Sequence, residues 1–429
     1  MIKFFKKIVV YILTVESRLI IWKFNPKIIA ITGNVGKTST KESIFSVLDG
    51  EVVIRKSEKS FNSEIGLPLT IIGLKNAWRN PLGWLKNILI GLKVSLFANE
   101  YPKWLVLEVG ADKPGDIKGI SKWLPVDIAV VTKIPEIPAH LENFKDRKEL
   151  VKEKFYILDA IKENGSLIID HDNLMDLGGK KIDVQMLSYG FDTSANMVAD
   201  DYHINYEEKK NDIPHGIFFR IDYKGHTLPI RMHKVFGKQN VYTAMASILV
   251  ADIVGINLLT AIEKLKEHET APGRFNILFG KNDSLVIDDA YNSSPSALRL
   301  AVETVKDIRC KGKKIAVLGD MLELGSIENE AHFSVGTILP EVFDCLVLIG
   351  DRVKFFGDGA LSSKMKKENI HDFKDTRPAS DFLLSILEKG DLVFVKGSQG
   401  VRLEKVVSLI VLDEERAKLV RQDTDWLKK

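Results

Sequence analysis

Cysteine is scarce in this sequence of 429 residues, which contains only Cys310 and Cys345. Two cysteines are too few for a framework of disulfide bonds, and without a Cys-x-x-Cys pair they do not indicate a zinc site. Such scarcity is typical of proteins in a reducing cytosol, so we expect a cytoplasmic protein.

A strong charge of either sign is also missing. The sequence has 61 Lys and Arg against 58 Asp and Glu, which is a formal net charge of +3. This balance argues against a general nucleic-acid-binding protein, and we expect no nucleic-acid partner. The composition, 45% hydrophobic and 28% charged, excludes a disordered, collagen-like or purely coiled-coil chain, and the length suggests two or three domains.

No hydrophobic run is long enough to span a bilayer. Residues 8–15 are apolar and follow several lysines, but residues 16–18 (ESR) interrupt them and no small-x-small cleavage site follows. We expect residues 1–27 to form an amphipathic helix that either packs on the next domain or lies on a membrane surface. The Trp- and Leu-rich residues 76–97 leave the same choice between a core helix and a membrane-surface helix.

Apolar runs of strand length alternate with longer helical stretches, which predicts a parallel α/β architecture. An alternating, polar stretch from 198 to 232 predicts antiparallel edge strands, and residues 241–254 predict a buried helix. The cluster Ala271-Pro272-Gly273 predicts a break between domains. The expected buried strands are 28–32, 104–109, 127–132, 166–170, 315–319, 345–349 and 392–396.

We therefore expect three parts. Residues 1–27 form the N-terminal helical segment, residues 28–273 a central P-loop-containing domain with a parallel sheet, and residues 274–429 a smaller Rossmann-like α/β domain.

The strand expected at 28–32 runs directly into the sequence GNVGKTS at 33–39 and then into a helix. Glycines let backbone N–H groups converge on a phosphate, and the helix N-terminus favours its negative charge. Ile31 stands where the longer P-loop pattern has its first glycine, but the position after a buried strand still favours a nucleotide site. The expected phosphate-binding residues are Gly33, Asn34, Val35, Gly36, Lys37, Thr38 and Ser39, with the Thr38 hydroxyl on Mg²⁺.

Glu108 ends a predicted strand, at the carboxyl edge where open α/β sheets bind ligands. A carboxylate oxygen there suits a Mg²⁺ ion that bridges phosphates. His140 follows the next strand and could reach the same edge. The alternatives are a carboxylate that caps a turn and a histidine that serves packing.

Residues 32–42 (TGNVGKTSTKE) resemble the phosphate loop of the Mur ligase family, the ATP-dependent amide ligases of cell-wall precursor synthesis. The similarity is greatest to the type that adds D-alanyl-D-alanine to UDP-N-acetylmuramoyl-tripeptide. It implies an ADP-forming ligase that joins a carboxylate to an amine through an acyl phosphate, with ATP and two Mg²⁺ ions. Further blocks follow in family order: FNSEIGLP (61–68), EVGA (108–111), AHLENF (139–144), DDAYN (288–292), VLGDMLELG (317–325) and VKGS (395–398).

The resemblance also implies roles for single residues. Lys37, His140 and Lys154 would be catalytic, and Thr38, Glu108, His140 and Lys154 would hold metal, with Lys154 carbamylated by CO₂. Carbamylation requires a neutral amine, and a solvated helix lysine is the alternative. Tyr156 replaces the acidic residue expected after Lys154, and Lys152 is the less favoured substitute.

The resemblance also implies contacts with the nucleotide and with the amine substrate. Asn240 would contact adenine, although Gln239 replaces the family histidine before it and a helix N-cap is the alternative. Arg274 would bind nucleotide at the domain junction, and Asp289 would bind ribose. In the C-terminal domain, His332, Lys396 and Ser398 are candidates for the amine's carboxylate or the transferred phosphate.

The sequence departs from the family pattern in the region that recognises the carboxylate donor. Muramyl ligases place a UDP-sugar-binding domain before the phosphate loop, whereas here residues 1–27 precede the first expected strand. We therefore expect a cell-wall precursor peptide and an amino acid or dipeptide as partners, with peripheral contact to the inner face of a membrane or a partner protein that supplies UDP recognition. Two other readings stay open: a glutamate ligase of the folylpolyglutamate synthase type, and a non-catalytic ATP-binding subunit of a wall-synthesis complex.

Overall fold

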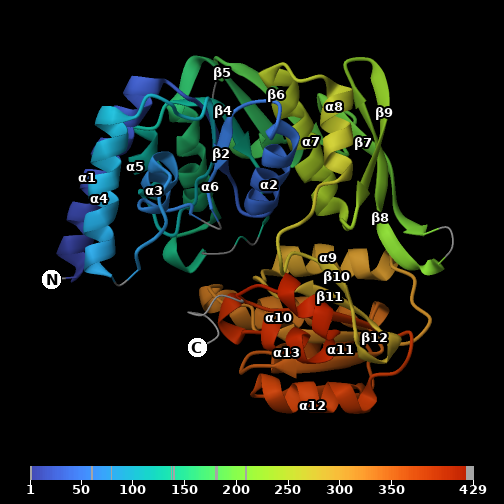
Figure 1. Ribbon diagram of the computed structural model, residues 1–429. Coiled ribbons are helices and arrows are strands. Elements are labelled where there is room, and N and C mark those ends of the chain that lie inside the picture. The colour runs from blue at the N-terminus through green and yellow to red at the C-terminus, as the bar shows by residue number, and fades with distance from the viewer. Residues whose placement is uncertain are drawn as a thin grey trace.

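The computed structural model describes residues 2–421 except 59–60, 79, 137, 139–140, 179–181 and 208–209, and excludes the side chains of 2–4, 207 and 210–212. Two open sheets lie in two domains, with the C-terminal domain beneath the central one in Figure 1. In the described chain the first sheet has nine strands, in the order β2 (Ile54–Lys56), β3 (Trp104–Glu108), β1 (Lys27–Thr32), β4 (Val126–Val131), β5 (Ile161–Asp170), β6 (Gln185–Gly190), β7 (Met197–Glu207), β8 (Lys210–Tyr223) and β9 (His226–His233).

The pairing in this sheet changes along its width. Strands β2 to β7 pair in parallel, whereas β7, β8 and β9 pair antiparallel. The polar alternation from 198 to 232 is therefore confirmed as an antiparallel edge. The short strands β2 and β6 were not expected from the sequence, because β2 has three residues and β6 begins with a polar, exposed residue.

Helices cover both faces of the first sheet. Alternate residues of β1 face opposite ways: Ile28 and Ala30 join one apolar core, and Ile29 and Ile31 join the other. The second core is closed by α2 (Lys37–Leu48), α7 (Lys238–Val254) and α8 (Leu258–Lys266). The first is closed by α3 (Gly66–Ile72), α5 (Asp116–Ser121) and α6 (Arg147–Phe155). The buried helix expected at 241–254 is confirmed as α7.

The second sheet begins just past the Ala271–Gly273 turn. Gly273 there has a φ of 70°, in the left-handed region that glycine adopts readily. Strand β10 pairs antiparallel and the others in parallel. The order is β10 (Asn276–Phe279), β11 (Leu285–Asp289), β15 (Leu392–Lys396), β12 (Lys314–Gly319), β13 (Cys345–Ile349) and β14 (Ile370–Phe373).

Helices also cover both faces of the second sheet. One apolar core includes residues of α9 (Pro295–Asp307), α10 (Glu328–Gly336) and α11 (Lys354–Ser362), and the other includes residues of α12 (Thr376–Ile386) and α13 (Glu404–Ile410). All seven buried strands expected from the sequence occur, and their parallel pairing confirms the α/β fold class.

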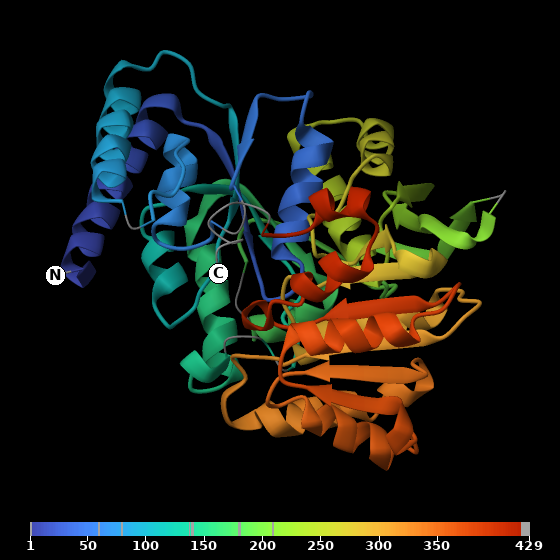
Figure 2. The same cartoon turned by 60° about the horizontal axis from the view of Figure 1, so that its bottom comes forward.

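The N-terminal helix α1 (Ile2–Phe24) lies beside α4 (Pro81–Phe97) at the outer edge of the central domain in Figures 1 and 2. Val9, Leu13 and Ile20 of α1 are buried in the first core, so the helix packs on the domain that follows it. Within the described residues, neither this helix nor any other has the length and apolarity that a membrane crossing requires.

Glu16 of α1 is buried against Gly91 of α4. A Cβ atom at Gly91 of α4 would lie only 2.0 Å from Glu16 Oε2, so glycine allows the approach. The carboxyl is 4% exposed, and Oε2 has no hydrogen-bond partner among the described residues. Burial raises the pKa of Glu16 from its ordinary value of 4.5 to about 7.

This raised pKa predicts a pH-dependent stability. Between about pH 4.5 and about pH 7, Glu16 stays protonated in the folded protein but is ionised in the unfolded chain. The free energy of unfolding therefore falls as the pH rises through this range, and it levels off above it. A Glu16→Gln substitution removes this loss. We expect it to raise the free energy of unfolding by about 2 kcal/mol more near pH 8 than near pH 5, measured by urea denaturation. Glu100→Gln, at an exposed position, is the control, and an equal effect of Glu16→Gln at both pH values would contradict the prediction.

Candidate active site

The phosphate loop connects β1 to α2 at the carboxyl edge of the first sheet. Gly33 has a φ of 127°, and a Cβ atom there would lie 2.3 Å from Thr132 Oγ1, so this position requires glycine. The backbone N–H groups of Asn34 and Val35 donate to the carbonyl of Lys133, at 3.1 and 3.0 Å. The loop is thus fixed to the end of β4, and the first turn of α2 leaves backbone N–H groups without partners inside the helix.

Glu108 ends β3, directly beside the phosphate loop. Its strand pairs with β1 so that Glu108 lies opposite Ile31, and the side chain is 2% exposed. Thr38 Oγ1 donates to Glu108 Oε2 at 3.0 Å, and Asn62 Nδ2 donates to Oε1 at 3.3 Å. Two of the expected metal-binding residues therefore meet, and Asn62 joins them from the FNSEIGLP block, where its role was not anticipated.

Lys154 lies on α6 and is only 2% exposed, so the alternative of a solvated helix lysine is wrong. Its ammonium donates to the carbonyl of Ala111 at 3.4 Å. Burial, together with the nearby charge of Lys37, lowers the pKa of Lys154 to about 7. Burial also lowers the pKa of Lys37, and the charge of Glu108 opposes that shift. A large fraction of Lys154 is thus neutral near pH 7, whereas Lys152 is exposed.

Glu153 holds α6 in this position. Its carboxylate accepts backbone N–H bonds from Gly115, Ile117 and Lys118 at the start of α5, at 2.9, 2.6 and 3.1 Å. A carboxylate at a helix N-terminus is a favourable contact, and this one places the neighbouring Lys154 amine toward the interior. His140, the other residue expected here, lies outside the described residues.

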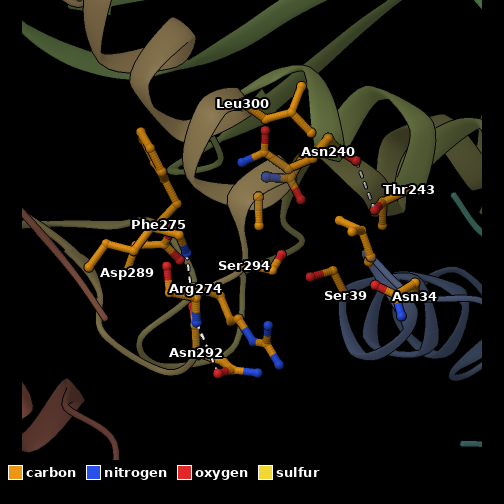
Figure 3. Close-up of a pocket in the computed structure, with 16 residues that line it drawn as sticks. Asn34, Ser39, Asn240, Thr243, Arg274, Phe275, Asp289, Asn292, Ser294 and Leu300 are labelled. Atoms are coloured by element: carbon orange, nitrogen blue, oxygen red, sulfur yellow. Dashed lines mark hydrogen bonds and ion pairs between the residues drawn. The ribbon is translucent and has the colours of Figure 1, made fainter. Parts of the chain in front are cut away.

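A pocket between the two domains brings the phosphate loop to residues from α7 and the C-terminal domain (Figure 3). Asn240 is 2% exposed and donates from Nδ2 to the carbonyl of Phe236 at 2.7 Å. Asn240 Oδ1 and Gln239 Oε1 have no hydrogen-bond partner among the described residues. Gly237 is the N-cap of α7, so Asn240 does not cap the helix and its free oxygen can accept a bond from a ligand.

The C-terminal domain supplies both positively and negatively charged side chains to the pocket. The Arg274 guanidinium lies 4.1 Å from the ring centre of Tyr291, and Lys396 Nζ lies 2.6 Å from Asp289 Oδ2 and 2.9 Å from the carbonyl of Asn292. Burial raises the pKa of Asp289, and Lys396 opposes the shift. Arg274, Asp289 and Asn240 thus line one pocket with the phosphate loop, although they are far apart in sequence.

Two expectations in the C-terminal domain are corrected. His332 accepts the Met321 N–H at Nε2, at 2.9 Å, and donates from Nδ1 to the Glu328 carbonyl at 2.6 Å, so neither ring nitrogen is left for a substrate. Ser398 Oγ accepts the Leu322 N–H at 2.9 Å and donates to the Ser293 carbonyl at 3.4 Å. Both side chains hold neighbouring loops together and lie outside the lining of the interdomain pocket, whereas Lys396 is part of that lining.

Known families account for most of the chain. The family model for the Mur ligase middle domain matches residues 31–251, and that for the Mur ligase glutamate ligase domain matches residues 273–399. The chain belongs to the Mur ligase family. The family expected from the sequence motifs is therefore confirmed.

Individual Mur ligases are similar over most of their length. The UDP-N-acetylmuramoyl-tripeptide–D-alanyl-D-alanine ligase of Bacillus subtilis is 28% identical over 386 residues, which cover 90% of this chain and 76% of that protein. The crystal structure of the MurF ligase from Thermotoga maritima in complex with ADP has a TM-score of 0.76 at 27% identity and covers 93% of this chain and 83% of that chain. Folylpolyglutamate synthase of Mycobacterium tuberculosis, with a TM-score of 0.62 at 13% identity, shares the fold alone.

The Lys396–Asp289 pair predicts a measurable coupling in stability. In Lys396→Met, Asp289 remains buried without its cation, and we expect the free energy of unfolding to fall by about 3 kcal/mol. Adding Asp289→Asn removes the buried charge and is expected to restore about half of the loss. Urea denaturation of the wild type, both single variants and the double variant gives the coupling, and additive effects would show that the pair does not interact.

Proposed function

We propose that this Mur ligase is an ADP-forming enzyme that uses ATP to join the carboxylate of a cell-wall precursor peptide to an amine. The observation that carries the proposal is the interdomain pocket, where the phosphate loop meets Asn240, Arg274 and Asp289. The names of its relatives indicate UDP-N-acetylmuramoyl-tripeptide as donor and D-alanyl-D-alanine as amine.

The pocket offers a partner for each part of ATP. The free Oδ1 of Asn240 would accept a hydrogen bond from the adenine amino group. Asp289 would accept hydrogen bonds from the ribose hydroxyls, and Arg274 would stack on the base or pair with phosphate. Lys37 and the first-turn N–H groups of α2 would hold the β- and γ-phosphates.

The residues beside the loop fit Mg²⁺. Thr38 and Glu108 supply the hard oxygen atoms that Mg²⁺ prefers, and we propose His140 and a carbamylated Lys154 for a second ion. Bound Mg²⁺ would supply charge neutralisation at the phosphate oxygens. Among the described residues, no three or more His, Cys, Asp or Glu side chains gather in a group that could hold a metal ion. The proposed ligands do not require such a group, because two of them are a threonine hydroxyl and a modified lysine.

The reaction has two steps. A carboxylate oxygen of the donor attacks the γ-phosphorus of ATP, which forms an acyl phosphate as ADP leaves. The amine then attacks the acyl carbon, loses a proton and expels phosphate, which leaves the amide bond. Lys37 stabilises the charge on the transferring phosphoryl group, and closure of the two domains excludes the water that would hydrolyse the acyl phosphate.

We also propose that CO₂ modifies Lys154. Its neutral amine would attack CO₂ and release a proton, which turns a buried cation into a carbamate anion. The support is the burial of the amine and its pKa of about 7. Below about pH 7 Lys154 is mostly in its ammonium form, which cannot react with CO₂. The modification and the activity are therefore expected to be lost together as the pH falls.

We propose that peripheral membrane contact or a partner protein contributes to recognition of the donor's carrier group. The names of the relatives do not favour the two other functions, a glutamate ligase of the folylpolyglutamate synthase type and a non-catalytic ATP-binding subunit, and an ADP-release assay separates all three.

Lys37→Ala tests the ligase proposal. We expect ADP release with the UDP-muramyl tripeptide and D-alanyl-D-alanine to fall at least about a thousandfold, because Lys37 stabilises the transferring phosphoryl group, while the thermal unfolding midpoint stays unchanged. Lys122→Ala, at an exposed position on the same domain, is the control.

Three results of the same assay would change the assignment. ADP release stimulated by L-glutamate and not by D-alanyl-D-alanine would favour the folylpolyglutamate synthase type. ATP binding without amine-dependent ADP release would favour the non-catalytic subunit. Tight binding of the UDP-muramyl peptide by the purified chain alone would contradict a need for a membrane or a partner.

Lys154→Ala tests the carbamate. We expect kcat/KM to fall by about a hundredfold, because a metal ligand is lost. The ¹³C NMR spectrum of the wild type in ¹³C-bicarbonate should show a carbamate signal that Lys154→Ala lacks and that Lys152→Ala keeps. A carbamate signal that survives in Lys154→Ala and disappears in Lys152→Ala would show that Lys152 is the modified residue and would overturn the proposal.

A further inference from the structure

Helix α4 is apolar on its outer face as well as on its inner face. Its buried positions are Trp84, Asn87, Gly91 and Ser95, and Ile88 and Val94 also pack against the core. Its outward positions carry leucines at 82, 85, 89, 92 and 96, which are between 45% and 77% exposed. A helix on a soluble protein normally turns its apolar stripe inward, so this outer face requires a partner that is itself apolar.

Helix α1 extends the same apolar edge. Glu16 lies against Gly91, and the Lys23 ammonium donates to the carbonyls of Leu96 and Ala98, at 3.0 and 2.8 Å, so the helices run side by side in the same direction. Tyr11 and Trp22 are 71% and 83% exposed. More than half of the large apolar side chains that are exposed in the described chain lie on these two helices.

The exposed charges that these two helices carry are all positive, and Lys6 of α1 pairs with Glu64 of a neighbouring turn at 3.0 Å. The two helices carry seven Lys or Arg residues, five in α1 and two in α4, whereas the whole chain has a net charge of only +3. Their one acidic residue is Glu16, which is buried. Arg18, Lys86 and Lys93 are exposed among the apolar side chains. Long basic side chains around an apolar face suit a surface with an apolar interior and anionic headgroups.

We propose that the outer edge formed by α1 and α4 binds the surface of an anionic lipid bilayer, with its leucine and aromatic side chains in the interface and its lysines and arginines at the headgroups. Trp22 and Tyr11 are the residue types that favour the membrane interface. A second copy of this chain is a poorer occupant, because two strongly basic edges would repel each other.

This orientation leaves the active site accessible. Figures 1 and 2 place α1 and α4 at the outer edge of the central domain, on the side away from the C-terminal domain. The interdomain pocket is built from the phosphate loop, α7 and the C-terminal domain and includes no residue of either helix. The bound protein could therefore open and close its two domains while it stays on the bilayer.

Vesicle co-sedimentation of the full chain tests the proposal. We expect binding to vesicles of phosphatidylcholine with anionic phosphatidylglycerol to be at least about tenfold stronger than binding to pure phosphatidylcholine, and to weaken as salt is added. Leu85→Gln with Leu89→Gln should reduce binding to anionic vesicles about tenfold, because two exposed leucines no longer insert. Lys86→Glu with Lys93→Glu should abolish the preference for anionic lipid.

Matched controls sit on other surfaces. Leu259→Gln, at a 65% exposed position on α8, and Lys354→Glu with Lys405→Glu, on the C-terminal domain, should bind vesicles like the wild type. Wild-type protein that binds neither vesicle, or α4 variants that bind as tightly as the wild type, would overturn the proposal. So would a dimer in solution that the leucine substitutions dissociate, because a second copy would then cover the edge.

The inference deepens the peripheral membrane contact proposed above and rests on it, but not on the ligase chemistry. Vesicle binding is measured without ATP, donor or amine, and ADP release is measured without vesicles. The two proposals can therefore fail separately.

Discussion

The contact between Thr38 and Glu108 depends on the pairing of β1 with β3, and the rest of the site depends on that contact. Parallel pairing places the ends of both strands at one edge of the sheet, so the hydroxyl that follows the phosphate loop comes within 3.0 Å of a buried carboxylate. A charge buried this deeply requires a partner, and Thr38, Asn62 and Lys41 surround it. The hydroxyl of Thr38 and the carboxylate of Glu108 are both hard oxygen atoms, the kind of ligand that Mg²⁺ prefers.

A second constraint is that neither domain holds the pocket alone. The phosphate loop and Asn240 belong to the first sheet, whereas Asp289 and Lys396 end neighbouring strands of the second sheet. Arg274 follows the turn that joins the domains, so rotation about that turn would change its distance from the loop. This division gives a physical basis for coupling occupancy of the pocket to closure of the domains, which would exclude water from the reaction proposed for this site.

Two of the buried ionisable groups, Lys154 and Glu16, lie in unrelated parts of the molecule, and the consequences of their burial differ. Lys154 and Glu16 are each less than 5% exposed, and burial shifts the pKa of each to about 7. At Lys154 the neutral form is a nucleophile next to a phosphate loop. At Glu16 the neutral form removes the one negative charge from a basic, apolar edge, which is a structural effect far from the chemistry. Similar pKa values therefore do not indicate similar roles.

The elements with strong local signals could be predicted before the fold was known: the seven buried strands, the phosphate loop, and the ordered motifs that identify the family. The hydrophobic pattern of a strand and the placement of glycines in a turn each involve residues that are close in the sequence. Both can therefore be recognised without knowing the fold. The three-dimensional arrangement was needed to show that both ring nitrogens of His332 bond to the backbone, that Lys154 is buried and that α4 turns its leucines outward. Each of those depends on which side chains from distant segments pack around the residue, and a linear pattern does not contain that information.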